Sequence, residues 1–146
     1  MIDTLKWLLK RDLEKLKTEL QQYQSEEHIW LIEKSIANSA GNLCLHLIGN
    51  LNAFIGAGLA KTSYVRQRDL EFTSTHIPRT TLLQQIDDTI IVVEKGLNNL
   101  TEEQLSGNFP IVIWDQPTGM EHTLILLATH LNYHLGQINY HRRLLD

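Results

Sequence analysis

The sequence predicts an all-α protein, a four-helix bundle with long ordered connections after its second and third helices. Apolar residues recur at steps of three and four over four long stretches, which is the period of an amphipathic helix. The chain has 146 residues, of which 42% are hydrophobic and 21% charged, as in an ordinary globular protein. No repeat or low-complexity segment breaks the pattern, so residues 1–146 are expected to form one domain.

The first helix is expected over residues 3–24, where leucines recur at helical spacing. Ser25 is a possible N-cap for the segment after it, because its hydroxyl can accept a hydrogen bond from a backbone N–H of the first turn. Residues 25–39 are expected to be a short irregular or helical connector. The leucines that carry the first helix are Leu5, Leu8, Leu9, Leu13, Leu16 and Leu20.

The second helix is expected from about residue 40 to residue 60, with Ser39 as its N-cap. Its apolar stripe consists of Leu43, Leu47, Leu51 and Phe54. The next segment, residues 61–79, has no sustained period and is expected to be a long ordered loop. A loop of that length in a compact domain usually serves a function.

The third helix is expected to open at Thr80 or Thr81 and to end near residue 99. Thr81 and Gln84 have the spacing of a capping box, in which two side chains bond each other's backbone N–H groups. Thr101 and Gln104 have the same spacing, which predicts a short helical turn over residues 101–105. The rest of the connection 101–119 contains glycines and prolines and is expected to be a loop with some extended character.

The last helix is expected from about residue 120 to residue 144, and it contains "THLNYHLGQINYH". His130 and His134 are one turn apart, about 6 Å along the axis, so their rings can converge on one metal ion. His141 shares the face but lies about 10 Å beyond His134, too far for the same ion. Gln137 lies between them and is a candidate hydrogen-bond partner of a ligand rather than a ligand.

A third ligand is expected from another helix, and His46 is the best candidate because it flanks the apolar stripe of the second helix. Asn42 and Asn50 lie one turn either side of it and make that flank polar. Two interpretations remain open from periodicity alone. His46, His130 and His134 can form a metal site, or they can belong to a polar rim or a buried hydrogen-bond network.

Two stretches of the chain resemble the DinB/YfiT-like superfamily, most closely its uncharacterised branch DUF1572. They are "AGNLCLHLIGNLNAFIGAGLAKTSYVRQRDLEF" (residues 40–72) and "HLNYHLGQINYHRRLL" (residues 130–145). The marks are a histidine inside the second helix and His-x-x-x-His-x-x-Gln-Ile in the last. Arg-x-Arg-Asp-x-Glu-Phe, residues 66–72, points to the branch. The order of helices agrees over nearly the whole chain.

The resemblance implies a DinB-like four-helix bundle, often a homodimer, that binds a divalent ion, zinc or nickel, through three histidines. These match His46, His130 and His134. It also implies a metal-dependent enzyme, because some relatives are transferases or isomerases that use a low-molecular-weight thiol. With an open metal position, the nucleophile would be a metal-bound water or thiol, which implies a thiol-dependent S-transferase or a hydrolase acting on a small-molecule substrate.

Each ligand histidine needs a partner on its other ring nitrogen, and the candidates are Asn50, Asp69, Glu71 and Gln137. The charged cluster from Arg66 to Glu71 has two interpretations. It can be an ion-pair network that orders the long loop or a dimer interface, which is favoured, or it can bind a substrate anion or support a ligand histidine. The rival to the enzyme is a non-catalytic bundle acting as a binding or scaffold protein, with the histidines as a polar structural layer.

Charge and cysteine content exclude several classes. The net charge is −4 with no basic block, so nucleic acid is not an expected partner. No apolar run is as long as a membrane helix needs and the N-terminus lacks the core of a signal peptide, so no membrane association is expected. Cys44 is the only cysteine, which excludes an internal disulfide and fits a cytoplasmic location.

Overall fold

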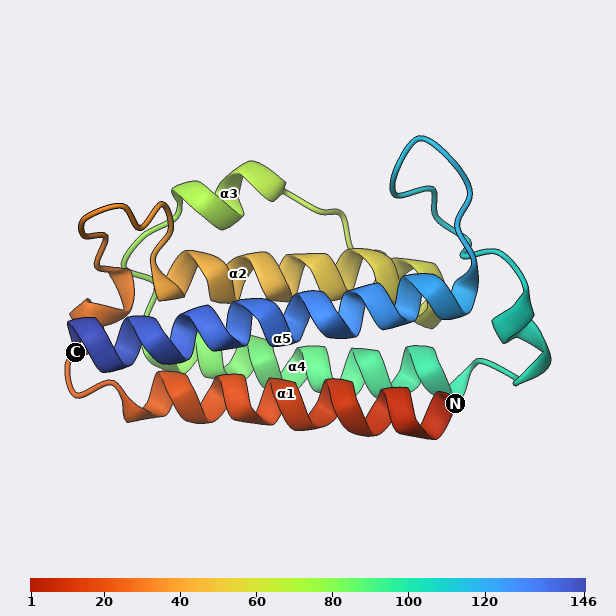
Figure 1. Cartoon of the computed structure of the whole chain (residues 1–146), viewed down its shortest axis with the longest axis horizontal. Helices are drawn as coiled ribbons and strands as arrows, with labels where there is room; N and C mark the ends of the chain where they lie inside the picture. The colour runs from red at the N-terminus through yellow and green to blue at the C-terminus, as the bar shows by residue number, and fades with distance from the viewer.

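The computed structural model describes residues 1–146 and consists of four long helices that run side by side (Figure 1). They are α1 (Ile2–Gln22), α2 (Ala40–Leu51), α4 (Arg79–Asn98) and α5 (Met120–Leu145). A π-helix, η2 (Asn52–Ala60), continues α2 without a break. The predicted all-α fold is confirmed, and the four helices lie within two residues of the predicted ranges, counting α2 and η2 as one.

The core is a continuous apolar cluster to which every long helix contributes. Of the predicted leucines of α1, five are buried, while Leu8 is only partly so. α1 packs against α4 and α5, and α2 packs against α5 and α4. The pairing of α2 with α5 matters most for function, since it brings two segments 84 positions apart in the chain into contact.

The start of α2 has the predicted N-cap. The Ser39 hydroxyl accepts a hydrogen bond from the backbone N–H of Asn42 at 3.1 Å, which satisfies a donor that the first turn leaves unpaired. Thr101 and Gln104 also form the predicted reciprocal bonds, at 2.9 and 3.4 Å, although the short helix η3 next to them covers only Glu103–Ser106.

Two predicted caps are wrong. Ser25 precedes a short 3-10 helix, η1 (Glu26–Trp30), but its side chain makes no capping bond. α4 begins at Arg79, before Thr81, so Thr81 already lies inside the helix and cannot cap it. The reason is Pro78, whose fixed φ of −54° suits the residue that precedes a helix.

The π-helix begins where a side chain enters the hydrogen-bond ladder of α2. The Asn52 amide donates to the backbone oxygen of Ile48 and to Thr89 Oγ1 on α4, each at 2.9 Å. Such an insertion competes with the backbone for the carbonyl and widens the next turn. The helix then ends at Lys61, which adopts a left-handed conformation with φ of 56°.

The two long connections contain more structure than a bare loop. Residues 61–79 include a short helix, α3 (Arg68–Thr73), where the sequence predicted only a loop. Six residues are too few to show a helical period, which explains the error. Residues 101–119 contain η3 and isolated antiparallel bridges, Asn108 to Gly119 and Trp114 to Gln116, so the predicted extended character is confirmed.

One stretch, Ala40–Ala60, is long and apolar enough to cross a membrane by length and composition, contrary to the expectation from its sequence. In the fold, 78% of its most apolar window is buried against the other helices. This burial is that of the core helix of a soluble protein, because its apolar surface already contacts protein.

Candidate metal centre

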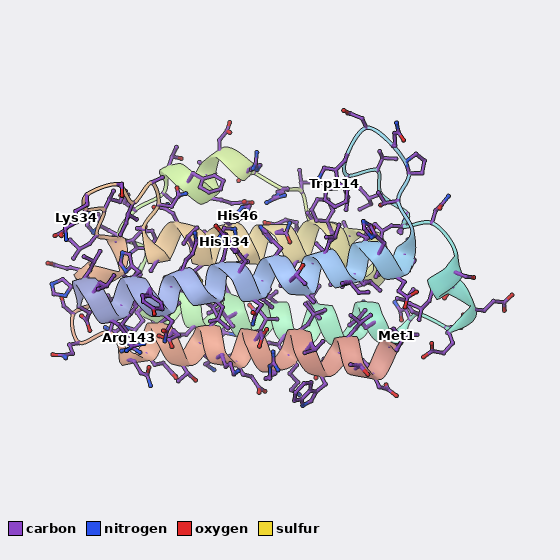
Figure 2. The ribbon with its side chains drawn as sticks, viewed as in Figure 1. Met1, Lys34, His46, Trp114, His134 and Arg143 are labelled. Atoms are coloured by element: carbon purple, nitrogen blue, oxygen red, sulfur yellow. The ribbon has the colours of Figure 1, made fainter.

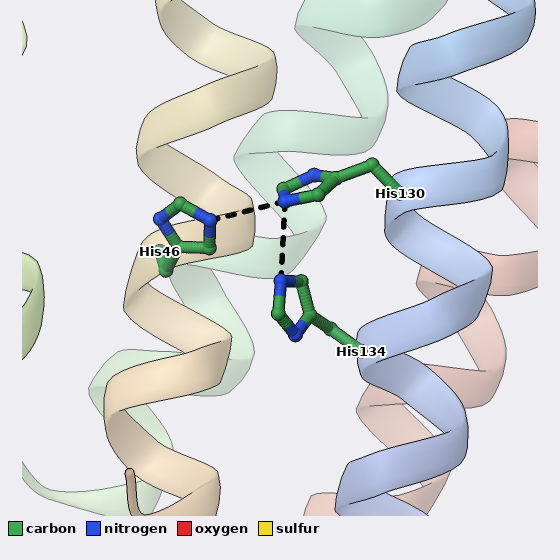
Figure 3. Close-up of side chains that lie close together, drawn as sticks. All are labelled: His46, His130 and His134. Carbon is green, nitrogen blue, oxygen red and sulfur yellow. Dashed lines mark hydrogen bonds between the residues drawn. The ribbon is translucent and has the colours of Figure 1, made fainter. Parts of the chain in front are cut away.

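Three histidines from two helices face one another where α2 and α5 meet. His46 comes from α2, and His130 and His134 come from successive turns of α5 (Figure 3). The Nε2 atom of His130 lies 3.1 Å from Nε2 of His46 and 3.1 Å from Nε2 of His134. The structure therefore brings together the three residues that the sequence singled out, across the contact between α2 and α5.

The spacing of the three nitrogens is close to that of a metal site. One ligand atom from each ring lies within 4.8 Å of the other two. A tetrahedral zinc ion with Zn–N bonds of 2.0–2.1 Å places its ligand nitrogens ~3.3 Å apart. Two of the three separations, at 3.1 Å, are already near that value, and the third pair, His46 and His134, lies within 4.8 Å. The residues therefore fit a divalent ion.

His46 is held in place by a carboxylate from the short helix α3. Its Nδ1 lies 3.0 Å from Glu71 Oε1, so Nδ1–H donates to the carboxylate and Nε2 is left as the free lone pair. Arg66 in turn donates from Nε and Nη2 to the two oxygens of Glu71, both at 2.9 Å. Glu71 is only 6% exposed and needs both partners, because a buried carboxylate is costly unless it is paired.

A glycine makes room for that carboxylate. Gly49 lies three residues after His46 on α2, on the side that meets α3. A Cβ added there would lie 1.9 Å from Oε2 of Glu71, well inside any normal contact. Glu71 can approach His46 only because this position has no side chain.

His134 is oriented from within its own helix. Its Nδ1 lies 2.7 Å from Oε1 of Gln137, and the Gln137 amide donates to the Tyr133 hydroxyl at 3.3 Å. His130 differs, because its buried Nδ1 has no hydrogen-bond partner. Nδ1–H of His46 and Nδ1–H of His134 each donate to an acceptor, so the Nε2 atoms of these two rings carry lone pairs. In the absence of an ion, Nε2–H of His130 is the donor between them (Figure 3).

A family model for proteins of unknown function, DUF1572, matches residues 2–146. The chain belongs to the DUF1572 family. No curated protein matches it. The branch to which the Arg-x-Arg-Asp-x-Glu-Phe motif pointed is thereby confirmed, and in this DUF1572 chain the motif supplies both Arg66 and Glu71.

The environment of the cluster favours the neutral form of two of its rings, His46 and His130. Burial lowers the pKa of His46 below its ordinary value, although the Glu71 carboxylate opposes the shift. Burial, and after it the neighbouring His134 and His46, lower the pKa of His130 to about 4. Neutral imidazole is the form that binds a metal ion, so the lowered pKa values of His46 and His130 favour metal binding near pH 7, with the proton of His130 moved to Nδ1 when Nε2 binds the ion.

The other candidate partners named from the sequence do not touch a ring nitrogen. Asp69 is exposed, and its backbone oxygen accepts from the Thr73 hydroxyl. Asn50 is buried, but its Oδ1 has no partner. His141 is bonded elsewhere, to the Tyr23 hydroxyl at 2.6 Å and to the Leu31 carbonyl at 2.8 Å. The structure therefore places it outside the cluster, as its spacing predicted.

A cavity of about 840 Å³ opens beside the cluster in this DUF1572 chain. His46 and His130 form part of its wall, together with polar residues of α2, α5 and the segment 66–68. Trp114, on the connection 101–119, forms another part of the wall, and Figure 2 shows it on the same side of the bundle as His46. Both long connections thus contribute to the wall.

Several residues that shape the site are not evident from the sequence. One is Gly49, although a glycine one turn from a candidate ligand is a signal of close approach by another segment. Another is Tyr133, whose hydroxyl accepts a hydrogen bond from the Gln137 amide. The sequence predicts one charged cluster from Arg66 to Glu71 and does not show which of its residues pair. In the structure Arg66 pairs with Glu71, whereas Arg68 and Asp69 form no ion pair.

Proposed function

We propose that His46, His130 and His134 hold a divalent metal ion and that the protein is a metal-dependent enzyme, a thiol-dependent S-transferase or a hydrolase. The observation that carries the proposal is the convergence of three Nε2 atoms beside an open cavity. Structural zinc sites are closed by four protein ligands, whereas catalytic sites have three and leave a position open. When bound, such an ion supplies the Lewis acidity that makes a water or a thiol nucleophilic near neutral pH.

The surrounding residues would position the ligands. Glu71 and Gln137 accept from the outer nitrogens of His46 and His134, which fixes the tautomer and direction of each ring. Arg66 holds Glu71, and the cavity admits a small-molecule substrate. Zinc or nickel suits a set of neutral imidazoles, and a low-molecular-weight thiol is the proposed cosubstrate of the transferase form.

Metal analysis of the purified protein tests this proposal directly. The parent protein is expected to bind one zinc or nickel ion per chain with submicromolar affinity, and His134→Ala is expected to lose it. His122→Ala is the matched control, because His122 is an exposed histidine of the same helix outside the cluster. A parent protein that binds no divalent ion overturns the proposal. Loaded protein is then assayed for thiol transfer to small electrophiles and for ester or amide hydrolysis.

A non-catalytic binding or scaffold bundle is the second candidate. Hydrogen bonds of 3.1 Å between the Nε2 atoms favour it, because they pair these three nitrogens without an ion, although Nδ1 of His130 is left without a partner. The two candidates differ in a measurable way. A polar layer predicts equal thermal stability with and without a chelator and no turnover, whereas a metal site predicts a higher melting temperature for the loaded protein.

Assembly and location belong to the same proposal. We propose a homodimer in the cytoplasm and a place in the DinB-like superfamily, on the strength of the resemblance carried by the motifs of residues 40–72 and 130–145. Light scattering of the purified protein checks the dimer, with a mass of one chain as the contrary result.

A further inference from the structure

The cavity beside the histidine cluster has a charge pattern of its own. Two arginines, Arg66 and Arg68, contribute to its wall, and no aspartate or glutamate does. Arg66 is neutralised by the bidentate pair with Glu71. Arg68 has no carboxylate within 4 Å, and its guanidinium lies 5.7 Å from the centre of the Phe72 ring, an aromatic contact that leaves its charge uncompensated.

A second polar group in the same wall lacks a partner. Asn50 lies one turn after His46 on α2, on the same face, and lines the cavity. Its side chain is more than nine-tenths buried, and Oδ1 makes no hydrogen bond. A buried amide without a partner costs free energy, so a donor supplied by a bound molecule would stabilise the site.

The rest of the wall is apolar. Phe54, Ile113 and Trp114 form one side, and Leu126 and Leu127 of α5 form another. Trp114 comes from the connection 101–119 and lies on the side of the bundle that carries the histidines (Figure 2). An apolar wall with a few convergent polar groups is the usual composition of a site for a small organic ligand.

We propose that this cavity binds an amphipathic organic anion, with its carboxylate or phosphate on Arg68 and its apolar body against Trp114 and Phe54. A hydrogen-bond donor of the same molecule bonds Asn50 Oδ1 beside the imidazoles. The inference rests on the proposed function, since it names the substrate class of that site. It divides the charged cluster 66–71 into a positioning pair, Arg66 with Glu71, and an anion-binding residue, Arg68.

Matched fragments test the anion. Zinc-loaded protein is titrated calorimetrically with 3-phenylpropanoate, its neutral isostere 3-phenylpropanamide, and phenyl phosphate. One or both anions are expected to bind at least tenfold more tightly than the amide, and the stronger anion identifies the natural head group. Equal affinity of acid, phosphate and amide overturns the proposal.

Arg68→Gln is expected to abolish the preference for the anion, because it removes the charge from an exposed side chain that makes no ion pair with the rest of the chain. Arg143→Gln is the matched control, since Arg143 is an exposed arginine of α5 over the Tyr140 ring and outside the cavity. A preference that survives Arg68→Gln and disappears on removal of zinc means that the carboxylate binds the metal, and this also overturns the proposal.

Asn50→Leu tests the donor. The analogue 3-(4-hydroxyphenyl)propanoate is expected to bind the parent more tightly than 3-phenylpropanoate and to lose this advantage in Asn50→Leu. No advantage in the parent contradicts the role of Asn50. Zinc content is measured for the parent and for every variant, which separates the two proposals. A parent protein without zinc counts against the metal site. An unchanged preference for the anion in fully zinc-loaded Arg68→Gln counts against this inference alone.

Discussion

Gly49→Ala is expected to weaken metal binding from a position that cannot touch the ion. The added Cβ would lie 1.9 Å from Oε2 of Glu71, while non-bonded heavy atoms normally approach to about 3.5 Å. The carboxylate must therefore retreat by about 1.5 Å. A shift of that size breaks a hydrogen bond of 3.0 Å, so His46 loses the acceptor that orients its ring.

The size of the effect can be worked out from the contacts that are lost. Loss of a hydrogen-bond partner of a metal-binding histidine typically costs 10- to 100-fold in affinity, and we expect zinc affinity to fall by about that factor. Glu71 is buried and also bonds Arg66, so the free energy of unfolding should fall by about 2–3 kcal/mol.

Gly136→Ala is the matched control. It is also a helical glycine, on the exposed face of α5 two residues from His134, but a Cβ there has no neighbour within 4 Å. Its zinc affinity should equal that of the parent, and its stability should rise by about 0.5–1 kcal/mol because alanine favours the helix. Competition with a chromophoric chelator measures zinc affinity, and urea denaturation measures stability. Parent-like zinc affinity in Gly49→Ala would refute the role of Glu71.

Three further predictions concern stability. In metal-free protein, the free energy of unfolding should fall as pH drops from about 6.5 to about 4, because His130 binds a proton in the unfolded chain but, with its lowered pKa, not in the folded one. Urea denaturation over this range should show a weaker dependence of the free energy of unfolding on pH for His130→Asn than for the parent. An equal dependence contradicts the assignment to His130. His141→Ala should lose about 2–3 kcal/mol in urea denaturation, because it removes two buried hydrogen bonds, yet still bind one zinc per chain; lost zinc would place His141 in the site. Ser39→Ala should cost about 1 kcal/mol in thermal unfolding by loss of the N-cap, and no change in melting temperature would argue against the cap.

The helices and the three histidines could be predicted because each rests on local periodicity. His130 and His134 share a face whatever the rest of the chain does, and His46 flanks an apolar stripe that must turn inward. That these flanks meet depends on which helices are neighbours, which periodicity does not decide. The direct contact of α2 with α5 supplied that link.

The partners of the histidines could not be predicted, since they depend on tertiary contacts. Glu71 and Asp69 were equal candidates in sequence, but α3 turns Glu71 inward and Asp69 outward. The α3 helix itself has only six residues, too few for a periodic pattern. The π-helix was also beyond prediction, because it depends on Asn52 reaching Thr89 on another helix.

The separation of His46 from His130 along the chain has a mechanical consequence. An ion held by both would tie together residues 84 positions apart and close a loop through α2, α3 and α4. By the chain-entropy argument used for disulfides, closure of a loop of that length restricts the unfolded chain by about 4.5 kcal/mol. The ion would then act as a removable crosslink, and a chelator would loosen the bundle at the same point where it removes the reactive centre.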